Sequence, residues 1–301
     1  MRPILVAGKT GQLARCLVDV AEQRALPIVA VGRPDFDLED SDSINRAVDA
    51  ALPRAIVNAA GYTAVDRAES DPERAFAVNR DGAERLAATA RRLQIPFVHV
   101  STDYVFDGRK SSAYFEDDIP FPLGVYGRSK LEGELAVMDT NPDALVFRTS
   151  WVYSPYGTNF LKTVLRLADT RDVVRVVDDQ RGAPTAAIDV ASAIVDILGQ
   201  IIEQNAQASA GIYHMTAGGE TTWYGFAKVI FSGWHDRGHR VPVLEAIASA
   251  DYPSLVGRPV NSRLDCGKID RVFGIRMPLW SMSVGACLDV LSASRQDVRS
   301  C

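Results

Sequence analysis

A tyrosine and a lysine stand four positions apart in the stretch VYGRSKLEGE, at Tyr126 and Lys130. On a helix, side chains at i and i+4 are neighbours on one face, so the ammonium group would lie near the phenol. A phenol with a pKa of about 10 donates protons poorly at neutral pH, and a nearby cation lowers that pKa by favouring the phenolate. The pair therefore predicts acid–base chemistry, although the same spacing also occurs on ordinary solvated helix faces.

Hydroxyl groups stand shortly before this pair, at the end of an apolar run. The stretch HVSTDYVFDG places Ser101, Thr102 and Asp103 where a buried strand would end. Ligands of parallel α/β sheets bind at the carboxyl ends of the strands. We therefore expect these side chains to face a substrate, with a hydroxyl placed to hydrogen-bond a carbonyl oxygen.

A glycine-rich turn, GKTGQLA, follows the first apolar run of the chain. Gly8 permits the tight turn, Gly11 lets the backbone approach a pyrophosphate, and the next helix offers unpaired N–H groups to the phosphates. A plain strand-to-helix turn is the alternative, but the position at the first strand favours dinucleotide binding. The residues expected to bind the cofactor here are Gly8, Thr10, Gly11, Gln12 and Leu13.

The second apolar run ends in AVGRPDFDL, where an acidic residue would usually bind the ribose hydroxyls of NAD. Arg33 stands there instead, and an arginine can pair with a 2'-phosphate. We therefore predict NADPH as the cofactor, with NADH as the alternative because Asp35 or Asp37 could still reach the ribose. Asp37 and Leu38 are included among the cofactor-binding residues.

The third apolar run ends in NAAGYT, with small residues where the adenosine side of a dinucleotide would lie against the sheet. Small residues at a strand end also pack helices, but this edge is the ligand edge of such folds. The cofactor-binding residues expected here are Ala60, Gly61, Tyr62 and Thr63.

These sites are held by alternating apolar runs and helix-period stretches, which predict an α/β fold with a doubly wound parallel sheet, the Rossmann type. After Trp151 the alternation continues to about residue 216, and residues 249–264 are rich in Pro, Gly and Ser, as expected for loops. We expect a dinucleotide-binding domain of residues 1–150 with 172–216, and a smaller substrate lobe of residues 151–171 with 217–301. The expected strands are residues 3–8, 27–32, 54–60, 96–102, 144–150, 173–178 and 211–216.

Composition excludes several classes of partner. Of the 301 residues, 47% are hydrophobic and 24% charged, and the net charge of −5 gives no basic excess for nucleic acid or an anionic membrane. The first apolar run is too short for a signal peptide or a membrane span, which favours a cytoplasmic protein. No metal site is predicted, because the four cysteines lack C-x-x-C spacing and the pair His235 and His239 has no evident third ligand.

Taken together, the glycine turn, the strand-end hydroxyls and the Tyr-x-x-x-Lys pair resemble the extended, nucleotide-sugar branch of the short-chain dehydrogenase/reductase superfamily. The likeness to the dTDP-4-dehydrorhamnose reductase family covers nearly the whole chain. It implies NADPH-dependent reduction of the C4 ketone of dTDP-4-dehydro-6-deoxy-L-mannose (dTDP-6-deoxy-L-lyxo-4-hexulose) to dTDP-L-rhamnose. The stretches that carry it are GKTGQLA, NAAGYTAVDRAESDPERAFAVN, STDYVFDG, PLGVYGRSKLEGE, FRTSWVY, DDQRGAPT and GRPVNSRLD.

The resemblance also implies roles for single residues. Tyr126 would protonate the forming alkoxide, Lys130 would hold the nicotinamide ribose and tune Tyr126, and Thr102 would bind the sugar oxygen, completing the catalytic set. Asp103 and Trp151 would bind the substrate, although Trp151 could equally be a core aromatic. Asn79 matches an asparagine that supports a proton relay, and three arginines are candidates for the diphosphate: Arg181, Arg258 and Arg263.

Departures from related patterns narrow the prediction. Some rhamnose-pathway reductases form dimers bridged by Mg²⁺ through acidic residues, but Cys16 and Ile188 occupy the matching places. Neither is a hard oxygen ligand, so we expect no magnesium-bridged dimer, whatever the oligomeric state. The related dehydratases have two acidic residues directly after the active threonine. Here Thr102 is followed by Asp103 and then by Tyr104, so the acidic pair is incomplete, which favours simple reduction over dehydration. The alternatives are a reductase or epimerase of another nucleotide sugar, and a non-catalytic regulatory subunit like that of methionine adenosyltransferase.

Overall fold

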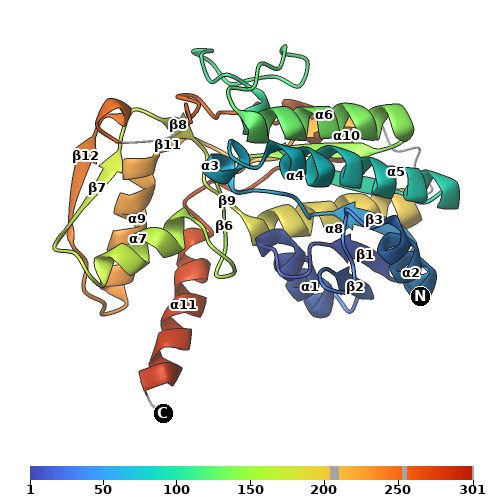
Figure 1. Cartoon of the computed structure of the whole chain (residues 1–301). Coiled ribbons are helices and arrows are strands. Elements are labelled where there is room, and N and C mark those ends of the chain that lie inside the picture. Colours follow the sequence, from blue (N-terminus) through green and yellow to red (C-terminus); the bar gives the residue numbers. More distant parts are fainter. Residues whose placement is uncertain (204–209, 253–255, 300–301) are drawn as a thin grey trace.

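The computed structural model describes residues 1–203, 210–252 and 256–299, which form a larger lobe built on a parallel sheet and a smaller lobe beside it (Figure 1). The sheet has six strands in the order β10-β5-β4-β3-β1-β2, and every neighbouring pair is parallel. This confirms the predicted α/β fold. The strands are β1 (Ile4–Ala7), β2 (Ile28–Val31), β3 (Ala55–Asn58), β4 (Phe97–Thr102), β5 (Leu145–Thr149) and β10 (Gly211–His214).

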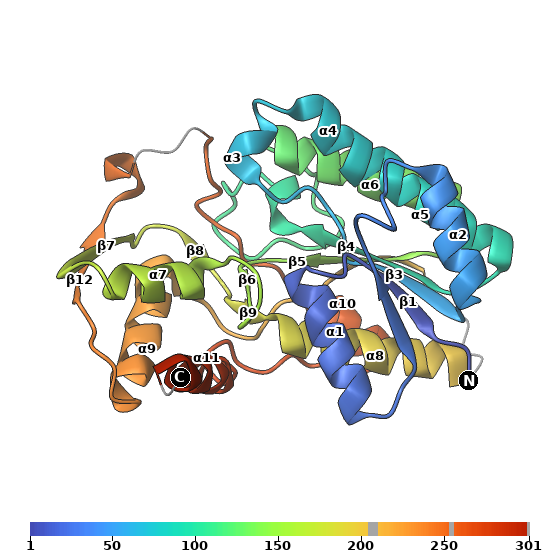
Figure 2. The same cartoon turned by 60° about the horizontal axis from the view of Figure 1, so that its bottom comes forward.

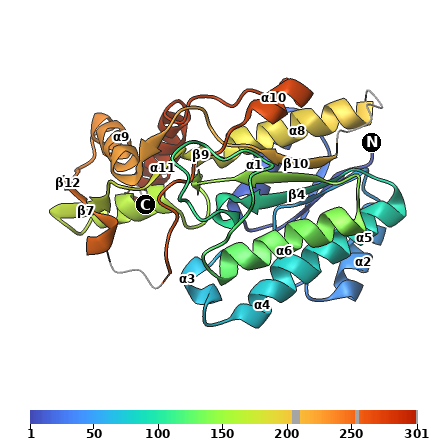
Figure 3. The same cartoon turned by 90° about the horizontal axis from the view of Figure 1, so that it is seen from above.

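Helices cover both faces of the sheet (Figures 2 and 3). One face packs against α1 (Gln12–Gln23) and α8 (Ala187–Glu203), which share a core with β1, β3, β4 and β5. The other face packs against α2 (Ser41–Ala51), α5 (Gly82–Leu93) and α6 (Val125–Thr140). The inner strands are mostly apolar, as expected for strands with both faces buried. The shorter elements α3 (Val65–Ala68), α4 (Pro72–Phe76) and the π-helical turn η1 (Ala77–Asp81) lead from β3 into α5.

The strand order reverses between β1 and β3, since the connections that leave these two strands run to opposite faces of the sheet. Such a switch point opens a crevice at the carboxyl ends of the strands, where ligands of open α/β sheets bind. The glycine turn after β1 and the small residues after β3 therefore stand on the two sides of one opening.

The smaller lobe has its own core, in which Trp234, Phe226 and Tyr153 are buried. Its helices are α7 (Phe160–Ala168), α9 (Trp223–Asp236) and α11 (Val284–Arg299), and its main strands are β7 (Val173–Val177) and β12 (Val243–Ile247), which pair in parallel. Short strand pairs join the lobes: β6 (Val152–Tyr153) with β9 (Thr185–Ala186), and β8 (Arg181–Gly182) with β11 (Thr221–Thr222).

One expected strand lies elsewhere than the sequence interpretation placed it. The sequence predicts that residues 172–216 belong to the dinucleotide-binding domain. Of this range, β10 joins the six-stranded sheet and α8 packs on it, whereas β7 pairs with β12. The division into domains stays a prediction. Residues along β7 alternate between exposed and buried at its start, so it suits a half-covered ribbon better than a sheet covered on both faces. Of the expected loop at 249–264, residues 253–255 lie outside those described.

The described residues hold neither a candidate membrane span nor a candidate metal cluster. No helix there has the length and apolar character needed to cross a membrane. In the same part of the chain, no group of three or more His, Cys, Asp or Glu side chains could hold a metal ion.

Candidate active site

A cavity of about 760 Å³ opens at the carboxyl edge of the sheet. All the residues that the sequence predicted for the cofactor line it, and so do the predicted catalytic set, Asp103 and Trp151, although these residues come from five strand ends and from α6. From the cofactor side to the substrate side they are Gly8, Thr10, Gly11, Gln12, Leu13, Arg33, Asp37, Leu38, Ala60, Gly61, Tyr62, Thr63, Lys130, Tyr126, Thr102, Asp103 and Trp151. Their individual roles remain predictions.

The glycine turn has the geometry that a pyrophosphate requires. Gly8 has a φ of +105°, and a Cβ atom there would lie 3.0 Å from the carbonyl oxygen of Ala59, so a larger residue would be strained and crowded. Gly11 begins α1 without a side-chain cap. The first N–H groups of the helix are therefore left to a ligand, and the helix dipole favours an anion there.

Cationic side chains besides Lys130 line the cavity. Arg33 is exposed at its rim, where it can meet a 2'-phosphate. Lys9, Arg67 and Arg74 line the same cavity and were not singled out from the sequence. They stand in a turn and two short helices, where no spacing rule marks them, and only the fold brings them to the same cavity as Arg33.

The loop after β3 is held by Asn79, which is buried in the π-helical turn. Its Oδ1 accepts the backbone N–H of Tyr62 at 2.8 Å, and its Nδ2 donates to the Tyr62 carbonyl at 3.1 Å and to the Ser129 hydroxyl at 2.9 Å. The amide thus fixes the cofactor loop against α6. A role of Asn79 in proton transfer stays a prediction.

Tyr126 and Lys130 lie on the buried face of α6, as the spacing predicts. The expected electrostatic effect, however, is reversed. The pKa of Tyr126 is raised above its ordinary value, chiefly because burial disfavours the phenolate and also because of the Asp103 carboxylate, while a hydrogen bond with Thr102 acts the other way. Lys130 does not lower it, because its Nζ donates instead to the carbonyl of Val100 at 2.7 Å. Burial lowers the pKa of Lys130 to about 8.

Thr102 and Asp103 form the floor of the site beside Tyr126. The Thr102 hydroxyl donates to Oδ1 of Asp103 at 3.1 Å, and it accepts the backbone N–H of Tyr104 at 3.2 Å. Burial raises the pKa of Asp103 to about 6. The ring of Tyr104 packs edge-on against Tyr126, with the ring centroids 5.4 Å apart.

Hydroxyls at the end of β5 add polar groups to the same cavity. Thr149 Oγ1 and Ser150 Oγ are buried without a hydrogen-bond partner, and both residues line the cavity. Buried hydroxyls are usually satisfied, so these two are placed to meet a bound molecule. The sequence could have predicted them, because ligands bind at strand ends and both residues stand at the end of the expected strand 144–150.

A buried ion pair fixes α6 to the strands that carry the site. Arg148 on β5 binds Glu134 on α6 through Nε and Nη2, the latter at 2.7 Å, and the Ser101 hydroxyl donates to the same carboxylate. Both charged side chains are almost fully buried. Because Glu134 is one turn beyond Lys130, this contact sets the position of the helix face that carries Tyr126 and Lys130.

Trp151 forms the wall of the cavity next to the smaller lobe. Its backbone has a φ of +50°, which is uncommon for a bulky residue, and its ring stacks on Trp223 with centroids 3.6 Å apart. A Cβ atom at Gly182 would lie 2.5 Å from the indole, so the ring fits only because that residue is glycine. Trp151 is therefore both a packed aromatic and a cavity wall.

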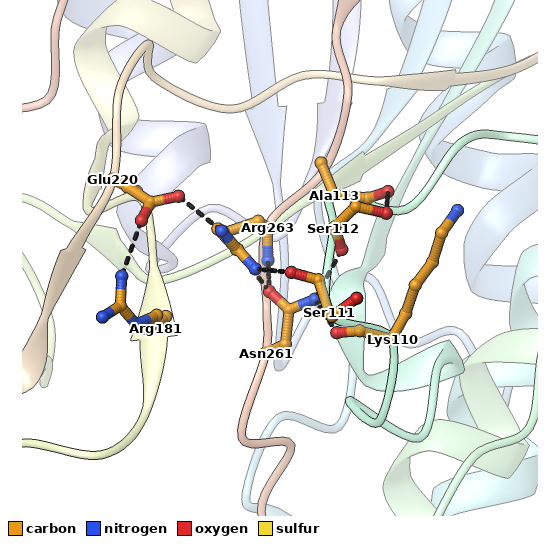
Figure 4. Close-up of polar contacts among 8 residues, drawn as sticks. All are labelled: Lys110, Ser111, Ser112, Ala113, Arg181, Glu220, Asn261 and Arg263. Atoms are coloured by element: carbon orange, nitrogen blue, oxygen red, sulfur yellow. Dashed lines mark hydrogen bonds and ion pairs between the residues drawn. The ribbon is translucent and has the colours of Figure 1, made fainter.

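Two of the candidate arginines are engaged with one carboxylate (Figure 4). Arg181 and Arg263 bind the two oxygens of Glu220 at 2.9 and 2.7 Å. Arg263 also donates to Asn261, whose amide donates to the backbone carbonyls of Lys110 and Ser112. This network joins the loop after β4 to the smaller lobe.

The third candidate, Arg258, lies closer to the chemistry. It donates to Asp66 at 3.0 Å and to the phenol oxygen of Tyr104 at 3.4 Å. Within the described part of the chain, none of the three arginines is among the residues that line the cavity. Their role in binding a diphosphate stays a prediction.

Residues named for possible metal sites lie away from this cavity. Cys16 is buried in α1, where burial raises its thiol pKa to about 12, and Ile188 is partly buried in α8. His239 stacks on Trp234 and shares a hydrogen bond with Ser292 at 2.8 Å. The absence of a magnesium bridge stays a prediction about the assembled protein.

Comparison with known proteins agrees with this geometry. A family described as the RmlD substrate binding domain matches residues 1–293. A dTDP-4-dehydrorhamnose reductase from Sinorhizobium fredii is 47% identical over 93% of this chain and 94% of its own length. A dTDP-4-keto-6-deoxy-D-glucose reductase from Streptomyces niveus is 41% identical over 75% of this chain and 77% of its own length.

A solved structure gives the same fold. The dTDP-4-dehydrorhamnose reductase of Bacillus anthracis, in complex with NADP, superimposes with a TM-score of 0.88 at 28% identity, over 96% of this chain and 99% of that one. The fold, the arrangement of the cavity and the matches over nearly the whole length agree. The chain therefore belongs to the RmlD substrate binding domain family, the family of the dTDP-4-dehydrorhamnose reductases.

Proposed function

We propose that the protein reduces the C4 ketone of dTDP-4-dehydro-6-deoxy-L-mannose (dTDP-6-deoxy-L-lyxo-4-hexulose) to dTDP-L-rhamnose with NADPH. The observation that carries this proposal is a single cavity shared by a dinucleotide turn and by the group Thr102, Tyr126 and Lys130. The NADP complex of the Bacillus anthracis reductase supports the choice of cofactor.

The residues present fit a bound dinucleotide. Gly8 and Gly11 leave space for the pyrophosphate, the uncapped start of α1 faces it, and Arg33 stands where a 2'-phosphate would lie. When bound, NADPH supplies the hydride for C4 of the sugar. Everything else in the reaction is binding, orientation and the movement of one proton.

Tyr126 is suited to donate that proton. Its raised pKa keeps the phenol protonated at neutral pH, and an alkoxide forming at the sugar is a far stronger base than a phenolate. The hydrogen bond between Thr102 and Tyr126 orients the phenol, and the proposal assigns the binding of the same sugar oxygen to the Thr102 hydroxyl. Trp151 presents an aromatic face to the cavity, against which the apolar side of a sugar ring can pack.

The test is turnover with a panel of nucleotide 4-keto sugars, followed by loss of NADPH absorbance and identification of the product sugar. The parent enzyme is expected to turn over the dTDP-L-lyxo-hexulose. Tyr126→Phe is expected to lower kcat at least 100-fold while NADPH still binds. Tyr224→Phe, a change of the same kind in α9 of the smaller lobe, is the matched control. Parental turnover by Tyr126→Phe would refute the assigned proton donor.

A second substrate is favoured by one observation, the relative from Streptomyces niveus whose name specifies dTDP-4-keto-6-deoxy-D-glucose. The panel therefore includes that sugar. Faster turnover of the D-gluco compound would assign the protein to that reaction and leave the proton donor unchanged. No turnover of either sugar would favour a non-catalytic role for the chain.

A further inference from the structure

The loop of residues 154–159, which leads into α7 of the smaller lobe, holds the first side chain of α1. Nδ2 of Asn159 donates to Oε1 of Gln12 at 2.8 Å, and the Ser154 hydroxyl lies 3.0 Å from the same oxygen. Both loop residues are buried. A Cβ atom at Gly157 would lie 3.2 Å from Cγ of Gln12, so the loop approaches this side chain closely. The glycine turn of the larger lobe is thus in direct contact with the smaller lobe.

The orientation of Asn159 is fixed by the backbone around it. Its Oδ1 accepts the backbone N–H of Lys162 at 3.1 Å and thereby caps α7. Its Nδ2 donates to the Ser154 carbonyl at 2.8 Å as well as to Gln12. A backbone N–H can only donate and a carbonyl can only accept, so these contacts determine which end of the amide is which. The end of Asn159 that faces Gln12 is therefore its NH₂ group.

This donor fixes the amide of Gln12 in turn. Because an amide NH₂ group cannot accept, the Gln12 atom beside Asn159 has to be the carbonyl oxygen. The NH₂ group of Gln12 is then the end that does not contact the loop, and among the described residues it has no hydrogen-bond partner. Gln12 lines the cavity, so its NH₂ group is left to a bound molecule.

We propose that Asn159 and Ser154 are positioning residues that hold the Gln12 amide with its NH₂ group toward the pyrophosphate of the cofactor. The amide adds a side-chain donor to the uncapped N–H groups at the start of α1. The smaller lobe thereby contributes to cofactor affinity through Asn159, which is not among the described residues that line the cavity. The inference rests on the proposed function only for the binding of NADPH at the glycine turn, and not for the sugar that is reduced.

Other contacts hold the same loop without involving the Gln12 amide. The guanidinium of Arg15 lies 3.8 Å from the centroid of the Tyr156 ring. Nζ of Lys162 donates to the Pro155 carbonyl at 3.0 Å. These contacts do not depend on the side chain at position 159. Shortening that side chain should therefore leave the loop in place and release only the Gln12 amide.

Binding of NADP⁺ to the full-length protein, measured by calorimetry without a sugar, tests the proposal. Asn159→Ser keeps an oxygen that can cap α7, because serine is as good a helix N-cap as asparagine, but its side chain is too short to reach Gln12. We expect this change to raise the Kd for NADP⁺ about 3- to 10-fold, the effect of losing one hydrogen bond. Asn159→Ala should weaken binding to the same extent and should also lower the stability of the protein, because α7 loses its cap.

A double-mutant cycle shows whether the effect passes through Gln12. Gln12→Ala removes the amide and is expected to raise the Kd for NADP⁺ at least about 10-fold, as for a hydrogen bond to a charged group. In that background Asn159→Ser should have no further effect, because the two residues act through one amide. The matched control is Thr222→Ala, which removes the cap of α9 in the same lobe. The Thr222 hydroxyl bonds Asp178 and the Gly225 N–H, so this change should leave the Kd unchanged.

A second ligand separates positioning from a general distortion of the site. Adenosine 2'-monophosphate has no pyrophosphate, so its Kd should be the same in the parent and in Asn159→Ser. If Asn159→Ser does not fold, Ser154→Ala removes the other contact to the same oxygen and should raise the Kd for NADP⁺ at least about 2-fold.

Three outcomes would overturn the proposal: an unchanged Kd for NADP⁺ in Asn159→Ser, additive effects in the double variant, or an equal loss with adenosine 2'-monophosphate. Each would make Asn159 a helix cap only. None of these measurements uses the keto sugar or depends on turnover, so a failure here is distinguishable from a failure of the proposed function.

Discussion

Replacing Asp103 with asparagine should lower turnover and raise the free energy of unfolding at neutral pH relative to its value at acid pH. The carboxylate is 3% exposed, and its Oδ2 is buried without a hydrogen-bond partner. Hydrogen bonds from Thr102 and Ser262 favour the ionised form, but burial outweighs them and raises the pKa from 3.8 to about 6. The folded protein therefore holds this proton more tightly than the unfolded chain does.

The size of the effect follows from the pKa difference. Between about pH 4 and pH 6 the folded state binds more protons than the unfolded state, so the free energy of unfolding falls as the pH rises. A difference of about 2 pKa units corresponds to about 3 kcal/mol, which is fully lost above pH 6. An asparagine side chain does not ionise and does not incur this loss.

The measurement is urea unfolding of parent and Asp103→Asn at several values of pH. We expect the difference in unfolding free energy to change in favour of the variant by about 3 kcal/mol between about pH 3 and pH 7, whatever constant offset the amide adds. Turnover of the keto sugar should fall, because Asp103 shares the Thr102 hydroxyl and lines the cavity. A difference that stays flat with pH, or shifts toward the parent, would refute the reasoning.

Three further changes test other parts of the site. Arg33→Ser should lower kcat/KM for NADPH by at least 10-fold and change that for NADH little; equal losses with both cofactors would remove Arg33 from the 2'-phosphate site. Trp223→Leu should raise KM for the keto sugar about 2- to 10-fold with little change in kcat, because Trp151 loses a stacking partner worth about 0.5–1.5 kcal/mol; an unchanged KM would contradict this. Arg148→Met should destabilise the protein by about 3–5 kcal/mol in urea unfolding, because it leaves Glu134 buried without a counter-charge, and the double change with Glu134→Leu should recover much of that loss.

The sequence predicted the site because its motifs follow strands. A parallel sheet brings the carboxyl ends of its strands to one edge, so residues after β1, β2, β3, β4 and β5 had to meet once the alternation was recognised. The sequence did not show which strands pair with each other when they are distant along the chain. β7 has a strand pattern, but a local pattern does not state which sheet a strand joins, and its half-exposed face directed it to β12.

The sequence also did not predict the direction in which a long side chain points. The spacing of Tyr126 and Lys130 places both on one face of α6. A lysine side chain has four rotatable bonds, however, so its ammonium group can turn toward the phenol or toward the sheet. His99 and Val100 decide this, and both belong to a strand that is distant along the chain. Burial, which is likewise a property of the whole fold, reversed the expected shift of the Tyr126 pKa.

By itself, the sequence thus determined the fold class, the edge at which the site lies and the residue types gathered there, since period and turn chemistry are local properties. The tertiary structure decided the charges and contacts of those residues. Only the folded chain buries Asp103, stacks Trp151 on Trp223 and places His99 beside Lys130, because each of these contacts joins groups that are distant along the sequence.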